Sequence, residues 1–132
     1  MSKVKEFFVA RYQSFRHAFR GWGYALRTQP NTWIHAFITI AVVIVALWLK
    51  LSARDWAVLL VMTAVVWAAE FFNTAIEAVV DLVSPDHHLL AKASKDAAAG
   101  AVLIAALIAV LVGLLILGPP LWARLVSTFL GN

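Results

Sequence analysis

Cysteine is absent from the 132-residue sequence, and charged side chains are scarce, at 14% of the residues. The lack of thiols excludes a disulfide framework and any thiolate metal site, so the chemistry of the chain must use oxygen and nitrogen groups. Soluble domains carry roughly 25% charged and 45–50% apolar residues. This chain is 63% hydrophobic and its mean hydropathy is +0.85, which argues against a soluble fold.

A glycine-rich phosphate loop is also missing. The segment Gly21-Trp22-Gly23 has neither the strand context nor the lysine that such loops require. A cleavable signal peptide is not expected either, because the stretch before the first apolar block is long and polar-faced and no small-residue cleavage site follows that block. What remains is three long apolar blocks, the pattern of a single membrane bundle.

We predict an all-α membrane protein with one domain, in which an amphipathic surface helix precedes three membrane-spanning helices. In the first 28 residues, bulky apolar residues recur every three or four positions and the arginines lie mostly off that stripe. Such a helix lies in the membrane interface or packs on the spans, and Pro30 ends it. The spans are each near or above the ~20 residues needed to cross a bilayer, and Gly118-Pro119-Pro120 is expected to end the third. The predicted ranges are 3–28 for the surface helix and about 31–49, 56–83 and 95–117 for the spans, within a domain of residues 1–132.

The distribution of lysine and arginine predicts the orientation. Eight of these residues lie before the first span or in the second connection, against three in the outer turn and the tail. The positive-inside rule therefore places the N-terminus in the cytoplasm. This positive charge suits an anionic membrane surface and not nucleic acid, because no soluble basic domain carries it.

Four polar side chains share one face of the second span. At about 100° per residue they fall within an arc of roughly 80°. A charged residue well inside the bilayer costs roughly 2.5–3.5 kcal/mol, so this stripe is expected to face protein, water or bound ions. Its members are Glu70, Asn73, Glu77 and Asp81.

Depth along the second span separates two of these acids. With Trp56 at the outer interface, Glu70 lies about 21 Å inward and Glu77 about 31 Å inward, in a hydrocarbon core about 30 Å thick. Lys95 and Asp96, at the cytoplasmic start of the third span, reach the same level. Acids, an amide and a lysine thus converge where a lipid head group meets a cytoplasmic solute, the arrangement that a membrane phosphotransferase needs. The inner connection adds Asp86, His87, His88 and Lys92 at this level.

Chemistry assigns a role to each of these groups. Phosphoryl transfer needs charge neutralisation, usually by Mg²⁺ on oxygen ligands, and a group that orients or deprotonates the attacking hydroxyl. Glu77, at the wet boundary, suits the metal. Glu70 lies deeper and suits the general base, because burial disfavours its charged form. Lys95 can pair with phosphate as a point charge, and Asn73 can fix the lipid hydroxyl or a phosphate oxygen.

Spacing alone leaves other functions open. Acids inside a membrane also serve as proton-relay groups in transporters, or as buried pairs that hold a bundle together. An ion relay would need polar residues through the outer half of the bundle, where residues 56–69 offer only Thr63. The histidines have a plain interpretation as side chains without a ligand: His17, His35, His87 and His88.

The segment 70–81, EFFNTAIEAVVD, is similar to the signature of the small prokaryotic diacylglycerol kinase and undecaprenol kinase family. The resemblance extends over nearly the whole chain, from about Ser14 to Leu117. It continues through 81–85 (DLVSP), 91–103 (AKASKDAAAGAVL) and 14–21 (SFRHAFRG).

The resemblance implies a homotrimer in the cytoplasmic (inner) membrane of a bacterium, with composite active sites between subunits that use ATP and Mg²⁺. By motif position, Glu70 is the catalytic base, Asn73 is its polar partner, and Glu77 is a metal ligand that also belongs to the nucleotide site. The further nucleotide contacts that the resemblance implies are His17, Asp86, His87, His88, Lys95 and Asp96. The lipid contacts that it implies are Arg16, Glu70 and Ala99.

Two positions depart from the family pattern. Gln29 stands where the family commonly has a second metal-binding glutamate. A neutral amide oxygen can touch Mg²⁺ but supplies no negative charge, so Gln29 leaves the second metal site open, while Glu77 can hold one ion together with the ATP phosphates. His87 replaces the aromatic residue expected there, which weakens the case for an adenine contact.

We therefore predict a lipid kinase that transfers the γ-phosphate of ATP to a lipid alcohol at the cytoplasmic face. The segments 73–77 and 81–85 resemble the undecaprenol kinase branch more closely, so undecaprenol is the expected acceptor and diacylglycerol the alternative. A small ion transporter and a scaffold that has kept the fold but lost turnover are the alternatives from other classes.

Overall fold

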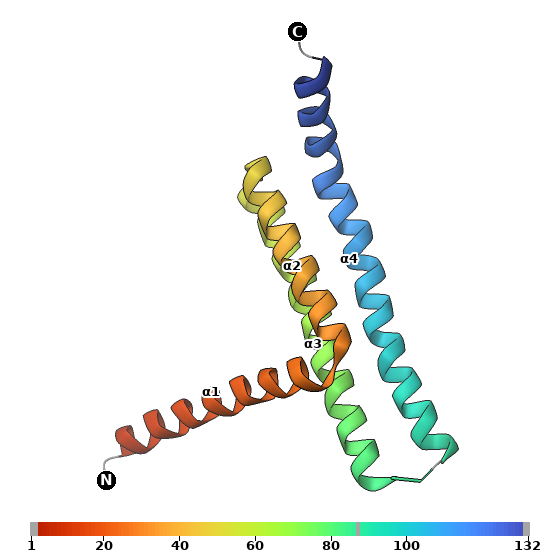
Figure 1. Ribbon diagram of the computed structural model, residues 1–132. Coiled ribbons are helices and arrows are strands. Elements are labelled where there is room, and N and C mark those ends of the chain that lie inside the picture. Colours follow the sequence, from red (N-terminus) through yellow and green to blue (C-terminus); the bar gives the residue numbers. More distant parts are fainter. Residues whose placement is uncertain (1–2, 87, 131–132) are drawn as a thin grey trace.

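Four helices make up the computed structural model, which describes residues 3–86 and 88–130 (Figure 1). Three of them are long and apolar enough to cross a membrane, and the described residues contain no strand. The prediction of an all-α membrane protein with three spans is confirmed. The helices are α1 (Lys3–Thr28), α2 (Pro30–Leu49), α3 (Ala53–Val83) and α4 (Leu89–Leu130).

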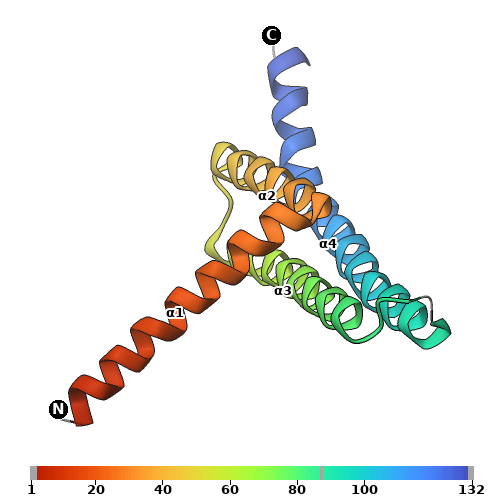
Figure 2. The same cartoon turned by 60° about the horizontal axis from the view of Figure 1, so that its bottom comes forward.

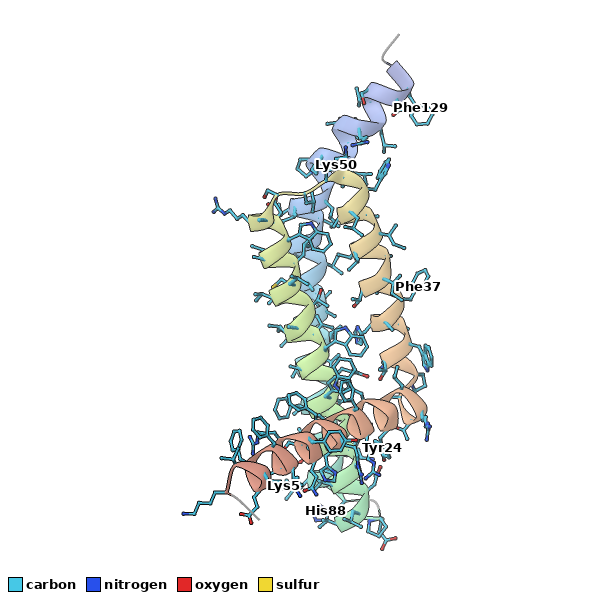
Figure 3. The ribbon with its side chains drawn as sticks, turned by 90° about the vertical axis from the view of Figure 1, so that its left-hand side faces the viewer. Lys5, Tyr24, Phe37, Lys50, His88 and Phe129 are labelled. Atoms are coloured by element: carbon cyan, nitrogen blue, oxygen red, sulfur yellow. The ribbon has the colours of Figure 1, made fainter. Side chains whose placement is uncertain are left out.

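The three long apolar helices run along one another, and α1 projects from them at the start of α2, with α3 and α4 extending beyond that level (Figure 1). α4 packs mainly against α3. Figure 2 shows α1 projecting from the bundle, with the N-terminus at its far end. We call the exposed part of this helix, residues 3–21, the arm of α1. We call the end of the bundle that carries α1 and His88 the α1 end, and the opposite end, at Lys50, the Lys50 end (Figure 3).

The chain turns sharply between α1 and α2 at Gln29. This residue has extended backbone angles, φ −115° and ψ 109°, and Pro30 occupies the first turn of α2. Proline disfavours the helical conformation in the residue before it, which is why α1 ends here as predicted. The Gln29 amide still donates to the Ala25 carbonyl at 2.9 Å, so the break is confined to a single residue.

The last two turns of α1 pack on the spans, while the rest of the helix is exposed. The Trp22 ring stacks on Trp67 and Phe71 of α3, with centroids 6.1 and 5.5 Å away. Ala25 is buried, and the Trp33 indole nitrogen donates to the Leu26 carbonyl at 2.9 Å. One part of α1 therefore packs on the spans, and the other part is an exposed amphipathic helix.

The turn between α2 and α3 is fixed by two caps. Lys50 ends α2 in the left-handed conformation, φ 54°, and the amide of Leu51 donates to the Ala46 carbonyl at 3.3 Å. This pattern satisfies carbonyls that the end of a helix otherwise leaves open. Ser52 begins α3, and its hydroxyl oxygen accepts from the Asp55 amide at 3.2 Å.

The helix that contains the predicted third span, residues 95–117, extends beyond that range at both ends. α4 begins at Leu89, where the His88 Nδ1 accepts from the Leu90 amide at 3.2 Å. It continues through Pro119 and Pro120 to Leu130, and its C-terminal turns leave the line of the rest of the helix (Figure 2). Two prolines remove only two donors, and such losses are tolerated in membrane helices. The residues after Pro120 form helices readily and carry their own amides.

A single chain buries few of its apolar side chains. The Phe37 side chain on α2, for example, is 74% exposed. Exposed apolar faces of this extent belong against lipid or another protein chain. The buried apolar residues are Ala25, Ala46, Leu49, Leu59, Val66, Ala98, Val102 and Ala105.

Candidate active site

Glu70 is a fully buried acid near the middle of α3, with only 1% of its surface exposed. Its Oε1 accepts a hydrogen bond from the Thr32 hydroxyl at 3.3 Å. Its Oε2 lies 3.7 Å from the His35 Nε2. Thr32 and His35 are three residues apart on α2 and so lie on one face of that helix. One polar side chain of α2 therefore lies beside each oxygen of this carboxyl group.

A cavity of about 250 Å³ opens beside Glu70 between α2, α3 and α4. Two buried oxygens of residues that line it, Glu70 Oε2 and Asn73 Oδ1, have no hydrogen-bond partner. Buried oxygens without partners are uncommon in proteins, and beside a cavity they are available to a ligand. α2 contributes Asn31, Ile34 and His35, α3 contributes Glu70, Asn73 and Glu77, and α4 contributes Ala99, Val102, Leu103 and Ala106.

Glu77 lies two turns beyond Glu70, at the α1 end of the same cavity, and two amide side chains hold it. The Gln29 Nε2 donates to its Oε2 at 2.5 Å, and the Asn73 Nδ2 donates to its Oε1 at 3.1 Å. Gln29 reaches this position because the break between α1 and α2 places it at the corner. The structure thus brings together the three residues that were predicted to bind metal or to partner the base.

The donor set around Glu77 fits one hard cation. The described residues contain no group of three or more His, Cys, Asp or Glu side chains that could hold a metal ion. A half-turn of the Gln29 and Asn73 amides exchanges nitrogen for oxygen, since the two atoms occupy equivalent places. The two amide oxygens then lie one beside each oxygen of the Glu77 carboxylate, and oxygen ligands of this kind are those that Mg²⁺ prefers.

A second hollow, of about 390 Å³, lies at the α1 end between the end of α3 and the start of α4. Lys95 pairs there with Asp81, and the Lys92 Nζ pairs with Asp96 at 2.8 Å. Four of the predicted nucleotide residues line this hollow: Asp86, His88, Lys95 and Asp96. His87, also predicted for the nucleotide, lies outside the described residues.

The predicted site is therefore divided between two hollows within one chain. Glu77 and Asp81, which line the cavity and the second hollow respectively, are one turn apart on α3, about 6 Å along the axis. Lys95 and Asp96 line only the second hollow. Arg16 and His17, on the exposed arm of α1, line neither of them.

Sequence reasoning missed Thr32 and gave His35 no role. Their signal was the spacing of three residues on an otherwise apolar span, because polar side chains within a membrane helix usually face a polar partner. The pattern of α2 alone does not say that this partner is Glu70 of α3, which depends on the register between the two helices.

Comparisons with known proteins point to one family. The model of the prokaryotic diacylglycerol kinase family matches residues 16–117. A diacylglycerol kinase of Synechocystis sp. is 49% identical over 86% of this chain, which spans 65% of that relative's length. An undecaprenol kinase of Bacillus subtilis is 44% identical over 83% of this chain and 89% of its own length. A diacylglycerol kinase of Escherichia coli is 33% identical over 74% of this chain and 85% of its own length.

Proposed function

The chain belongs to the prokaryotic diacylglycerol kinase family, and from this premise we propose that it transfers the γ-phosphoryl group of ATP to the hydroxyl of a membrane lipid. The observation that carries the proposal is the Glu70 cavity: a buried carboxyl group with one oxygen free, one wall of apolar α4 residues and Glu77 at one end. An apolar wall suits a lipid chain, and a free carboxylate oxygen suits the hydroxyl proton.

In this mechanism Glu70 is the general base. The lipid hydroxyl oxygen forms a bond to the γ-phosphorus, the bond from that phosphorus to the bridging oxygen of ADP breaks, and Glu70 takes the hydroxyl proton. Asn73, next to Glu70 in the cavity, orients the acceptor oxygen or a phosphate oxygen through its amide. Ala99 of α4 lines the same cavity and gives the lipid an apolar contact.

Glu77 holds the metal ion with Gln29 and Asn73. Mg²⁺, when bound, neutralises phosphate charge and so lowers the barrier to transfer. Glu77 supplies the negative charge of the site, while Gln29 supplies a neutral amide oxygen, and a single ion is therefore the expected occupancy. The fit of the donor set, one carboxylate between two amides, supports this assignment.

The second hollow receives the nucleotide. Lys95 pairs with Asp81 there. When the nucleotide binds, Lys95 exchanges this carboxylate for a phosphate oxygen, so that one anionic partner replaces another. Asp86, His88 and Asp96 line the same hollow. His17 and Arg16 lie on the arm of α1, and in the proposed assembly they meet the nucleotide and the lipid head group respectively, from the membrane surface.

We propose undecaprenol as the acceptor and a homotrimer as the assembly. The undecaprenol kinase of Bacillus subtilis matches this chain over most of both lengths. The apolar surfaces that a single chain leaves open support contact with further copies, which would complete the divided site. Lysine and arginine favour a cytoplasmic N-terminus and hence phosphorylation at the cytoplasmic face of the inner membrane.

The proposal is tested with purified protein in lipid nanodiscs, labelled ATP and two acceptors, undecaprenol and diacylglycerol. We expect labelled product from both lipids in the presence of Mg²⁺, with the higher kcat/KM for undecaprenol. A higher kcat/KM for diacylglycerol would overturn the acceptor but not the reaction. If no lipid is labelled, the kinase hypothesis fails and a scaffold or an ion relay becomes the better explanation.

A further inference from the structure

Thr32 is a hydroxyl group with no access to solvent at the point where three helices meet. Its side chain is buried, with 0% of the residue exposed. The Thr32 oxygen lies 3.3 Å from Glu70 Oε1 on α3 and 3.4 Å from the Ala25 carbonyl oxygen on α1. A hydroxyl carries one proton, so it donates to one of these two acceptors at a time.

The hydrogen bond from Thr32 leaves the two oxygens of Glu70 unequal. Oε1 is held by Thr32, whereas Oε2 is buried, has no hydrogen-bond partner and belongs to a residue that lines the cavity. The His35 Nε2 lies 3.7 Å from Oε2. When Thr32 donates to Oε1, that hydrogen bond favours one orientation of the carboxyl group and leaves Oε2 available to a ligand.

We infer that Thr32 is the positioning residue of the general base: its hydroxyl anchors Oε1 of Glu70 so that Oε2 faces the acceptor hydroxyl and takes its proton. This inference rests on the proposed function. When the proton arrives on Oε2, Oε1 becomes the carbonyl oxygen and still accepts from Thr32. The hydrogen bond from Thr32 to Oε1 is therefore kept in both protonation states of Glu70. Proton transfer leaves neither the Thr32 hydroxyl nor Oε1 without a partner.

The inference is tested by comparing two substitutions of Thr32 with one matched control. Thr32→Val keeps the shape and removes the hydroxyl, while Thr32→Ser keeps the hydroxyl. Thr39→Val makes the same chemical change two turns further along α2, where the threonine oxygen accepts a hydrogen bond from the Trp67 indole at 3.1 Å and is not part of the cavity lining. The assay is steady-state phosphorylation of undecaprenol in nanodiscs with varied ATP.

We expect Thr32→Val to lower kcat about 10-fold, since losing a hydrogen bond to a charged group costs enough for that factor. The KM for ATP should stay unchanged, because Thr32 does not line the second hollow. Thr32→Ser should keep kcat within about threefold of wild type, and Thr39→Val should keep it fully. A kcat of Thr32→Val equal to that of Thr39→Val would overturn the role of Thr32.

Thermal unfolding supplies a second measurement that needs no turnover. Thr32→Val is introduced into the wild type and into Glu70→Leu, and the two losses in Tm are compared as a double-mutant cycle. A larger loss in the wild-type background supports the anchor, whereas equal losses show that Thr32 and Glu70 do not interact. Failure of the proposed function looks different: the wild type then labels no lipid. An active wild type matched by Thr32→Val refutes only the inference about Thr32.

Discussion

The amide of Gln29 allows a direct test of the proposed metal site. The substitution Gln29→Glu replaces the donor that lies 2.5 Å from Glu77 Oε2 by a second carboxylate. Without a cation the hydrogen bond is lost and two negative charges meet, a repulsion of about 4 kcal/mol for charges 4 Å apart at an effective dielectric constant of 20. With Mg²⁺ bound, both carboxylates become ligands.

Relief of even a third of this repulsion, about 1.4 kcal/mol, tightens the apparent affinity for Mg²⁺ tenfold. The assay measures the rate of lipid phosphorylation against free Mg²⁺ at constant Mg-ATP. We expect the half-saturating Mg²⁺ concentration to fall at least 10-fold in Gln29→Glu, with the preference between lipid acceptors unchanged. Gln13→Glu, the same change on the exposed arm of α1, is the matched control. Superimposable Mg²⁺ curves for Gln29→Glu and the wild type would refute the assignment of Gln29 to the metal site.

Two further predictions concern the scaffold that positions the site. Ser52→Ala removes the hydroxyl cap of α3 and should lower the free energy of unfolding by about 1 kcal/mol. The control is Ser14→Ala, which should be neutral because the Ser14 hydroxyl bonds only within its own helix. Thermal unfolding in detergent compares the two variants. Trp22→Leu removes the stack that anchors α1 on α3 and should cost about 1 kcal/mol, against no effect for Trp122→Leu on the exposed face of α4. Equal Tm values within either pair would contradict the corresponding contact.

The helices could be predicted from the sequence because their signals are local. Apolar runs of about 20 residues predict membrane-spanning helices, because a helix satisfies its own backbone groups in lipid. The restriction that Pro30 places on the backbone of Gln29 acts between neighbouring residues. Pro119 and Pro120 show the limit of such rules. A proline weakens a helix by removing a donor, but whether the helix stops there depends on the next residues along the chain, and those after Pro120 continue α4.

The candidate site was predictable along α3 and not between helices. The spacing of Glu70, Asn73 and Glu77 places them on one face of α3, and the structure has all three lining one cavity. The partners from α2, Thr32 and His35, depend on how two helices are aligned, which no single span records. For the same reason, the pairing of Lys95 with Asp81 in the second hollow was not predicted.

The division of the site has a physical meaning for the mechanism. In the proposed mechanism, the buried Glu70 would receive the acceptor hydroxyl in an apolar setting, while the hollow at the α1 end would receive the charged nucleotide from water. Glu77 stands between the two, half-buried and one turn from Asp81. Transfer between lipid and nucleotide would therefore take place at this boundary.

The role of Glu70 is tested most directly by removing the base while leaving its shape. Glu70→Gln should still bind labelled ATP with wild-type affinity, because Glu70 is not part of the second hollow, but should phosphorylate undecaprenol at least 10²-fold more slowly, the usual contribution of a general base. Glu6→Gln, on the exposed arm of α1, should keep both properties. Turnover by Glu70→Gln at the rate of Glu6→Gln would contradict the claim that buried Glu70 accepts the proton of the lipid hydroxyl.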